Sequence, residues 1–301
     1  MRILDLLRTR RIAVRSFLCC AAIAFQWASI PAASAVEVTG LSEDGDALRA
    51  YPVNGVPLLD SFLLQFSDND DHNVQALTVW PGSPIPGSCL DCEQVTPGSI
   101  FLSLRDDDSR EPFFFQVSHV DVPVGVRQRI SAVCVVTCRL PLNKPARDSV
   151  FVLVGFSFNF MGVDHEIQRI GLWEENGEMV VHYRDETGDD QFRIDAEFVF
   201  LPPAMVPKRG NVSGIKASEA AAVTVNLGPV ASGPTVIRGF DFVFRPELDF
   251  GVGHNEEIRK IGIRTPGNMV EVICADNEND LFDWGVDWGA LKIPVLDPPR
   301  G

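Results

Sequence analysis

Apolar residues alternate with polar or small residues in three separate stretches of the chain. An apolar period of two is the pattern of a half-buried β-strand, and phenylalanine enrichment supports that interpretation. After each stretch come an acidic loop, an aliphatic strand, a turn, a second acidic loop and a strand closed by proline. The sequence therefore predicts three copies of one β module. The alternating residues are Phe62, Leu64 and Phe66, then Phe156, Phe158 and Phe160, then Phe240, Phe242 and Phe244.

The spacing within the copies repeats as well as their order. Seven residues separate Asp106 from Phe113 in the first copy and Asp185 from Phe192 in the second. No stretch shows sustained helical spacing, so the predicted fold class is all-β, with three tandem antiparallel β-sandwich modules. Proline ends the strand before it because it cannot donate a hydrogen bond to a β-ladder. The segments Pro123–Gly125, Pro202–Pro203 and Pro207–Gly210 therefore mark the boundaries, and the predicted modules are residues 36–124, 125–205 and 206–301.

Residues 1–35 have the pattern of a signal peptide. Five arginines and the apolar run from Ser16 to Ile30 precede the small residues Ala33, Ser34 and Ala35. Such residues suit a signal peptidase, so we expect cleavage near Ala35 and a secreted or periplasmic protein. No later segment offers about 18 unbroken apolar residues, and no membrane span is expected.

Acidic residues outnumber basic ones by a wide margin. The chain has 26 Lys and Arg against 41 Asp and Glu, and removing the five Arg and one Asp of residues 1–35 leaves 21 against 40, or a net charge of −19. A surface of this sign repels nucleic acid and anionic lipid, so neither is an expected partner.

Each module is predicted to carry its two acidic loops at one end. In an antiparallel meander, the first and third connections lie at the same end. Clustered carboxylates are ligands that Ca²⁺ takes, which makes Ca²⁺ the candidate cofactor. The alternative is that these residues are solvated turn residues, because Asp and Asn favour turns. The candidate ligands are Asp71, Asp106, Asp164, Asp185, Asp189, Asp190, Asp276 and Asp280.

Histidine follows aspartate at the same point of two modules, as Asp71-His72 and Asp164-His165. An Asp-His pair can serve as a general base. A copied motif favours a structural turn instead, because an active site needs one asymmetric arrangement. The chain also lacks the Gly-x-Ser-x-Gly, His-Glu-x-x-His and glycine-rich phosphate-binding motifs. The sequence therefore favours a protein without catalytic activity, and a secreted hydrolase with a site between modules is the alternative.

Five cysteines follow the leader. Cys134 and Cys138 lie on one predicted strand from Ile130 to Leu140, where an extended backbone would hold them about 13 Å apart, beyond disulfide reach. In one alternative, Cys134 and Cys138 form disulfides with Cys89 and Cys92 and so link the first module to the second. In the other, Cys89 forms a disulfide with Cys92. Four thiolates could also bind zinc, but an exported chain favours disulfides.

Four tryptophans are candidate ligand-binding residues. Trp80 and Trp173 each follow the aliphatic strand of their module, while Trp284 and Trp288 share one face of the last strand. An exposed indole is a flat apolar platform for sugar rings or protein partners. The alternative is that these rings pack in the core or between modules.

Several segments of the second and third modules follow one order of apolar strands: Val136–Leu142, Ser149–Phe156 and Phe192 onward, then Ala221–Pro229, Gly233–Phe240, Ile258–Ile263 and Asp283–Leu291. This order resembles that of the H-type lectins. The resemblance implies six-stranded β-sandwich modules that bind sugars, usually as trimers. The chain departs from the lectin pattern at its acidic loops and long insertions, so the resemblance assigns no binding residue.

Taken together, these patterns predict an exported, non-catalytic binding or surface-associated protein. Its expected ligand is a glycan or a protein, and Ca²⁺ is expected to stabilise it. Oligomers are compatible with the sequence, and a structural assembly subunit is a further alternative.

Overall fold

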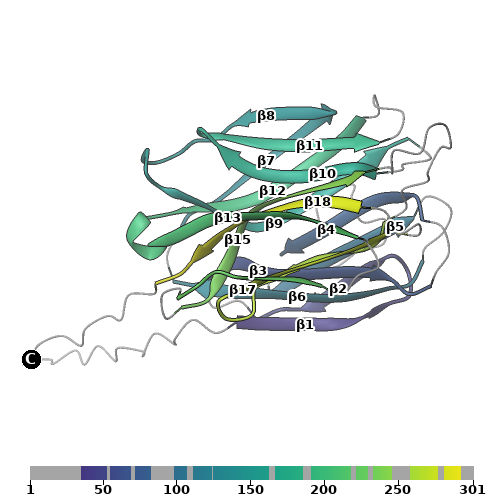
Figure 1. Ribbon diagram of the computed structural model, residues 1–301, viewed down its shortest axis with the longest axis horizontal. Helices are drawn as coiled ribbons and strands as arrows, with labels where there is room; N and C mark the ends of the chain where they lie inside the picture. The colour runs from purple at the N-terminus through teal and green to yellow at the C-terminus, as the bar shows by residue number, and fades with distance from the viewer. Residues whose placement is uncertain are drawn as a thin grey trace, which may run out of the picture. The chain divides into compact units, whose positions relative to one another are not determined.

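The computed structural model describes most of the chain after the predicted leader (Figure 1). No helix in the described stretches is long and apolar enough to cross a bilayer. The described residues are 35–52, 55–68, 72–82, 98–106, 111–123, 125–162, 167–185, 191–217, 222–229, 233–245, 258–276 and 281–292.

The described residues form strands that fall into three sets of six along the chain, as the alternating pattern predicts. The first set is β1 (Ala35–Ser42), β2 (Asp46–Ala50), β3 (Val56–Phe66), β4 (Val74–Pro81), β5 (Ser99–Asp106) and β6 (Phe113–Val122). The second set is β7 (Arg127–Val135), β8 (Thr137–Pro141), β9 (Val150–Met161), β10 (Ile167–Glu175), β11 (Glu178–Asp185) and β12 (Gln191–Leu201). After the short 3-10 helix η1 (Pro203–Met205), the third set is β13 (Lys208–Ala217), β14 (Val223–Asn226), β15 (Thr235–Arg245), β16 (Ile258–Arg264), β17 (Met269–Asp276) and β18 (Leu281–Ala290).

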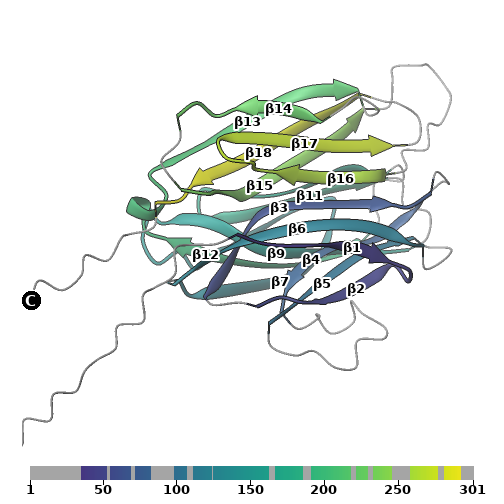
Figure 2. The ribbon, with the colours of Figure 1, turned by 90° about the horizontal axis from the view of Figure 1, so that it is seen from below.

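The strands pair into three antiparallel six-stranded sheets, and every sheet is shared between two sets. Sheet A has the order β1-β6-β3-β16-β17-β14, sheet B the order β2-β5-β4-β9-β12-β7, and sheet C the order β13-β18-β15-β10-β11-β8. Figure 2 shows sheet A running from β14 to β1. At the centre of each sheet, the third strand of one set pairs with the fourth strand of another: β3 with β16, β9 with β4, and β15 with β10. These three seams join the sets in a closed cycle.

The predicted meander needs a correction. β4 and β5 are hairpin neighbours in sheet B, but β3 and β6 pair with each other in sheet A. The four core strands of a set are therefore divided between two sheets. All of these pairs stay antiparallel: Phe66 faces Phe113 where β3 ends and β6 begins, and Val74 faces Asp106 where β4 begins and β5 ends.

One phenylalanine from each set meets at the centre of the core. Phe62 of β3, Phe156 of β9 and Phe240 of β15 are buried. Their ring centroids lie 5.2 Å apart for Phe62 and Phe156, 5.6 Å for Phe62 and Phe240, and 5.0 Å for Phe156 and Phe240. The prediction that these residues occupy equivalent strands is confirmed. The same buried cluster includes residues of all three sheets, so the sets share one core.

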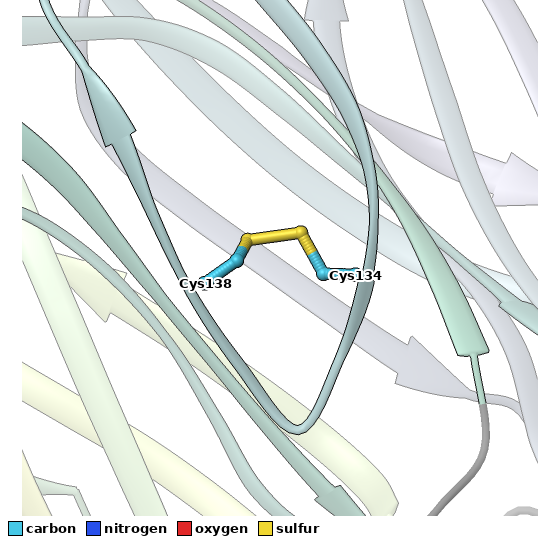
Figure 3. The surroundings of a disulfide bond; sticks show 2 residues. All are labelled: Cys134 and Cys138. Carbon is cyan, nitrogen blue, oxygen red and sulfur yellow. A yellow bond between two sulfur atoms is a disulfide. The ribbon is translucent and has the colours of Figure 1, made fainter.

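The cysteine geometry departs from the sequence-based expectation. Cys134 and Cys138 form a disulfide with a Cα to Cα distance of 5.9 Å (Figure 3). The expectation assumed one extended strand, but the chain turns at Val136, whose φ is 59°, and passes from β7 in sheet B to β8 in sheet C. Cys89 and Cys92 lie outside the described residues, and Cys274 is a buried free thiol.

Candidate functional site

Three of the candidate metal ligands are buried at the ends of strands. Asp106, Asp185 and Asp276 end β5, β11 and β17, and each faces the first residue of the preceding strand. The side chain of Asp106 is only 6% exposed, and Asp185 and Asp276 are buried. Among the described residues, no cluster of His, Cys, Asp and Glu is arranged to hold a metal ion. The other candidates, Asp71, Asp164, Asp189, Asp190 and Asp280, lie outside the described residues.

His72 joins the two acidic connections of the first set. Its Nδ1 lies 2.9 Å from Asp106 Oδ2, its Nε2 lies 2.8 Å from Asp68 Oδ1, and its ring stacks on Phe66 at 3.8 Å. Burial lowers the pKa of His72, but the hydrogen bond to Asp106 and the two carboxylate charges raise it by more, so the net direction is upward. The raised pKa favours the charged form of His72 beside the two carboxylates. Since the side chain is only 1% exposed, it has no access to a substrate.

Three of the four candidate tryptophans do not offer an exposed face. Trp80, Trp284 and Trp288 are 2%, 4% and 8% exposed. Trp284 and Trp288 belong to the central core, which agrees with the packing alternative rather than a ligand platform. Trp173 is half-buried and is the candidate that retains an accessible ring.

Trp173 lies in a groove on the outer face of sheet C, with a volume of about 710 Å³. This volume falls within the range of about 300 to 1,000 Å³ that small-molecule sites occupy. Phe240 and Trp284 border the groove on the side of the core, because both residues belong to the buried core cluster. The lining residues are Arg169, Trp173, Glu174, Glu175, Asn211, Ser213, Phe240, Asp241, Val243, Asp283, Trp284, Gly285 and Asp287.

The floor of the groove follows one row of cross-strand neighbours. Ser213 of β13 faces Gly285 of β18, and Gly285 faces Asp241 of β15. Asp241 in turn faces Gly171 of β10. Alternate residues of a strand point to the same face, so this row consists of three small residues and one aspartate. Small side chains leave the middle of the sheet low.

One wall of the groove is formed by the adjacent row, in which Asp283 faces Val243 and Val243 faces Arg169. Arg169 reaches diagonally to Asp241 and donates two hydrogen bonds, with Nε at 2.9 Å from Oδ1 and Nη2 at 2.7 Å from Oδ2. A bidentate pair of this kind fixes both side chains in one geometry. It also ties β10 of the second set to β15 of the third.

The opposite wall contains Asn211, Asp287 and Trp173. Asn211 Nδ2 donates to Asp287 Oδ1 at 2.9 Å, which orients both polar groups across β13 and β18. Trp173 lies against Gly239 of β15, where an added Cβ would come within 2.5 Å of the Trp173 Cβ. Glycine is therefore needed at position 239 for the indole to take its place.

His182 supports the indole from the side. Its ring meets Trp173 edge to face, with centroids 4.7 Å apart. Burial lowers the pKa of His182, and the nearby charge of Arg169 lowers it further. The imidazole is therefore neutral at pH 7, and the indole is held without a titrating contact at that pH.

Glu174 and Glu175 border the groove next to Trp173, and both are engaged by basic residues. Glu174 Oε1 lies 3.2 Å from Lys144 Nζ and accepts a hydrogen bond from the backbone N–H of Gly177 at 2.9 Å. Glu175 Oε2 lies 2.7 Å from Arg139 Nη2. The carboxylates of Glu174 and Glu175 are thus held in place. With Asp283 and Asp287, they give the groove more acidic than basic lining residues.

The equivalent seam of sheet B is closed. Thr78 and Ser157 take the places of Gly171 and Asp241, and they hydrogen-bond to each other at 2.7 Å. The Arg129 guanidinium lies 4.9 Å above the ring of Trp80 and covers it.

The seam of sheet A carries Arg264 in place of the tryptophan, and Arg264 Nη2 donates to Gln116 Oε1 at 2.7 Å. Of the three seams, within the described residues, the one in sheet C combines a half-buried indole with a floor of small residues.

Sequence reasoning found Trp173 but missed the polar residues around it. The segment from Asp283 to Trp288 alternates Asp, Trp, Gly, Val, Asp and Trp, and its period of two puts Asp283, Gly285 and Asp287 on the face opposite the tryptophans. That pattern was visible in the sequence. The contribution of Arg169 was not visible, because β10 and β18 come together only through the shared sheet.

No protein-family model matches this chain, and no curated protein matches its sequence.

Proposed function

We propose that this protein is an exported, non-catalytic carbohydrate-binding protein whose site is the groove on sheet C. The observation that carries the proposal is the half-buried Trp173 beside polar groups that are already fixed in hydrogen-bonded pairs. An indole face suits the apolar face of a sugar ring. Carboxylate and amide groups suit sugar hydroxyls, which both donate and accept hydrogen bonds.

The charges of the groove favour a ligand without negative charge. Asp283 and Asp287 border it on β18, and the chain as a whole is strongly acidic. An anionic sugar would be repelled by carboxylates at short range. Neutral glycans are therefore the proposed class, in line with the sugar binding that the resemblance to H-type lectins implies.

Fixed polar pairs also favour binding over catalysis. Arg169 and Asp241 are bound to each other, as are Asn211 and Asp287. Groups that are oriented before the ligand arrives lose less conformational entropy on binding. This arrangement of pre-oriented polar groups supports a surface that binds a ligand without reacting with it.

An array of immobilised neutral, amino and acidic glycans, run with and without Ca²⁺, tests the proposal. We expect binding to neutral glycans, and Trp173→Ala should weaken it by at least about tenfold, because a central aromatic contact contributes more than about 1.4 kcal/mol. Phe114→Ala is the matched control, since Phe114 is 47% exposed but lies on sheet A. Absence of binding to every glycan, or equal loss in both variants, would contradict the proposal.

A further inference from the structure

The groove is longer than one sugar ring, and its direction across the strands bears on the size and orientation of the ligand. The floor row runs at right angles to the strands, from Ser213 on β13 through Gly285 and Asp241 to Gly171 on β10. Four neighbouring strands at about 4.8 Å spacing span roughly 14 Å from first to last. One sugar ring fills only part of such a distance.

The polar groups are spread along this direction and do not converge on one point. Asn211 and Asp287 form their hydrogen bond between β13 and β18, near one end. Arg169 and Asp241 form theirs between β15 and β10, near the other end, where Trp173 also lies. A pocket for a terminal sugar would gather these groups around a single ring. Here the two polar pairs lie apart: the Asp241 carboxylate lies over Gly171, where an added Cβ would come within 2.5 Å of Asp241 Oδ1, and Gly285 leaves the space between the pairs open.

The middle of the groove is kept low by Gly285. An added Cβ there would meet Asn211 Nδ2 at 3.8 Å as its nearest neighbour, so the position has room for a side chain. The backbone of Gly285 is not in the left-handed region, and close packing does not require glycine at this site. The lack of a side chain instead leaves a passage between the two polar pairs.

From this geometry we infer that the groove binds an extended, uncharged oligosaccharide laid across β13, β18, β15 and β10, with one ring on Trp173 and further rings over Gly285. This inference rests on the proposed function and adds the chain length and orientation of the ligand. The second polar pair, Asn211 and Asp287, contacts rings that a monosaccharide on Trp173 does not reach.

Isothermal titration calorimetry with a graded series of neutral oligosaccharides tests the inference. The series, from monosaccharide to hexasaccharide, is built on the sugar that binds best on the glycan array. Affinity should rise by roughly tenfold or more between the monosaccharide and the trisaccharide, since each added contact of moderate strength multiplies the association constant. It should then level off once the groove is filled. An oligosaccharide carrying uronic acids should bind more weakly than its neutral counterpart of equal length.

Two variants locate the added rings. Gly285→Leu places a side chain in the middle of the groove and should abolish the gain in affinity that comes with a longer oligosaccharide. Gly285→Ala, with its smaller methyl group, should reduce the gain in part, and it keeps the test valid if the leucine variant folds poorly. Circular dichroism and the melting temperature of each variant check the fold.

The outcomes separate this inference from the proposed function. The inference of an extended ligand is wrong if the monosaccharide and all longer ligands bind equally, or if Gly285→Leu leaves the dependence of affinity on chain length intact. Neither result would contradict the proposed glycan binding. If Trp173→Ala leaves the affinities unchanged, the groove is not the site and both are wrong.

Discussion

Asp60 on β3 is a half-buried residue whose Oδ1 atom is buried, and this burial raises its pKa to about 6 although Ser118 donates a hydrogen bond to it. The folded protein therefore binds this proton more tightly than the unfolded chain, whose value is near 3.8. The resulting stability is present below pH 3.8 and is lost as the pH rises through about 6. The loss is on the order of 3 kcal/mol at neutral pH, since one pKa unit is worth about 1.4 kcal/mol.

Asp60→Asn removes this ionisation and keeps a similar shape. We expect the variant to melt higher than the wild type at pH 8 and to lose that advantage at pH 4. Thermal unfolding followed by circular dichroism at the two pH values measures the difference. A shift of equal size at both values would show that ionisation of Asp60 is not its cause.

Folding favours the charged form of His72, whereas it favours the neutral form of Asp60. Its pKa is raised by Asp106 and Asp68 against the effect of burial. The stabilisation is fully present below pH 6.5 and is lost as the pH rises through the folded value. His72→Gln should therefore destabilise the protein more at pH 5.5 than at pH 9.

The matched control for this prediction is His182→Gln, because burial lowers the pKa of His182. Its contribution to stability is present above pH 6.5 and falls as the pH drops, so the pH trend of this variant should have the opposite sign. Thermal unfolding of both variants across this pH range is the measurement. Parallel trends in the two variants would contradict the opposite directions of their pKa shifts.

At the level of single elements, strands were predictable and their corners were not. The alternation of Phe156, Phe158 and Phe160 predicts β9 because each phenylalanine faces the core. The corner between β7 and β8 has no such signal. Val136 takes a φ of 59°, a conformation that is rare for β-branched residues, and neither Gly nor Pro marks the position. The sequence therefore reads as one strand, and the disulfide at the corner was missed.

The Cys134–Cys138 disulfide fixes this corner between two sheets. Closing so short a loop in the unfolded chain is worth about 2 kcal/mol by the chain-entropy estimate. We expect reducing agent to lower the melting temperature of the wild type by more than that of the Cys134→Ser, Cys138→Ser double variant. Mass spectrometry that finds both thiols free in the oxidised protein would contradict the pairing.

The groove is an element-scale feature that sequence reasoning reached only in part. Its indole and its β18 residues follow from local alternation. Its shape depends on the pairing of β15 with β10, and Asp241 and Gly171 are separated by 70 positions in the chain. Local patterns fix which face a residue takes, but they do not fix which strand of another set lies beside it.

For the whole molecule, the shared sheets make the three sets interdependent. β9 pairs with β4 of the first set and β10 pairs with β15 of the third, so the second set alone would expose two central strands. We expect residues 125–205 expressed alone to lack a cooperative unfolding transition. The full chain should unfold in one transition by calorimetry. A fragment that melts cooperatively with a native-like spectrum would contradict this dependence.

The central claim, that the groove on sheet C binds a glycan through Trp173, can be tested by the accessibility of the indole. Trp80, Trp284 and Trp288 are buried, and Trp173 is half-buried. Trp173 should therefore dominate fluorescence quenching by acrylamide in a chain of residues 36–301, which lacks Trp27. Saturation with a neutral oligosaccharide that binds on the array should reduce quenching in the wild type and leave it unchanged in Trp173→Phe. Equal quenching of the wild type with and without bound ligand would contradict the account.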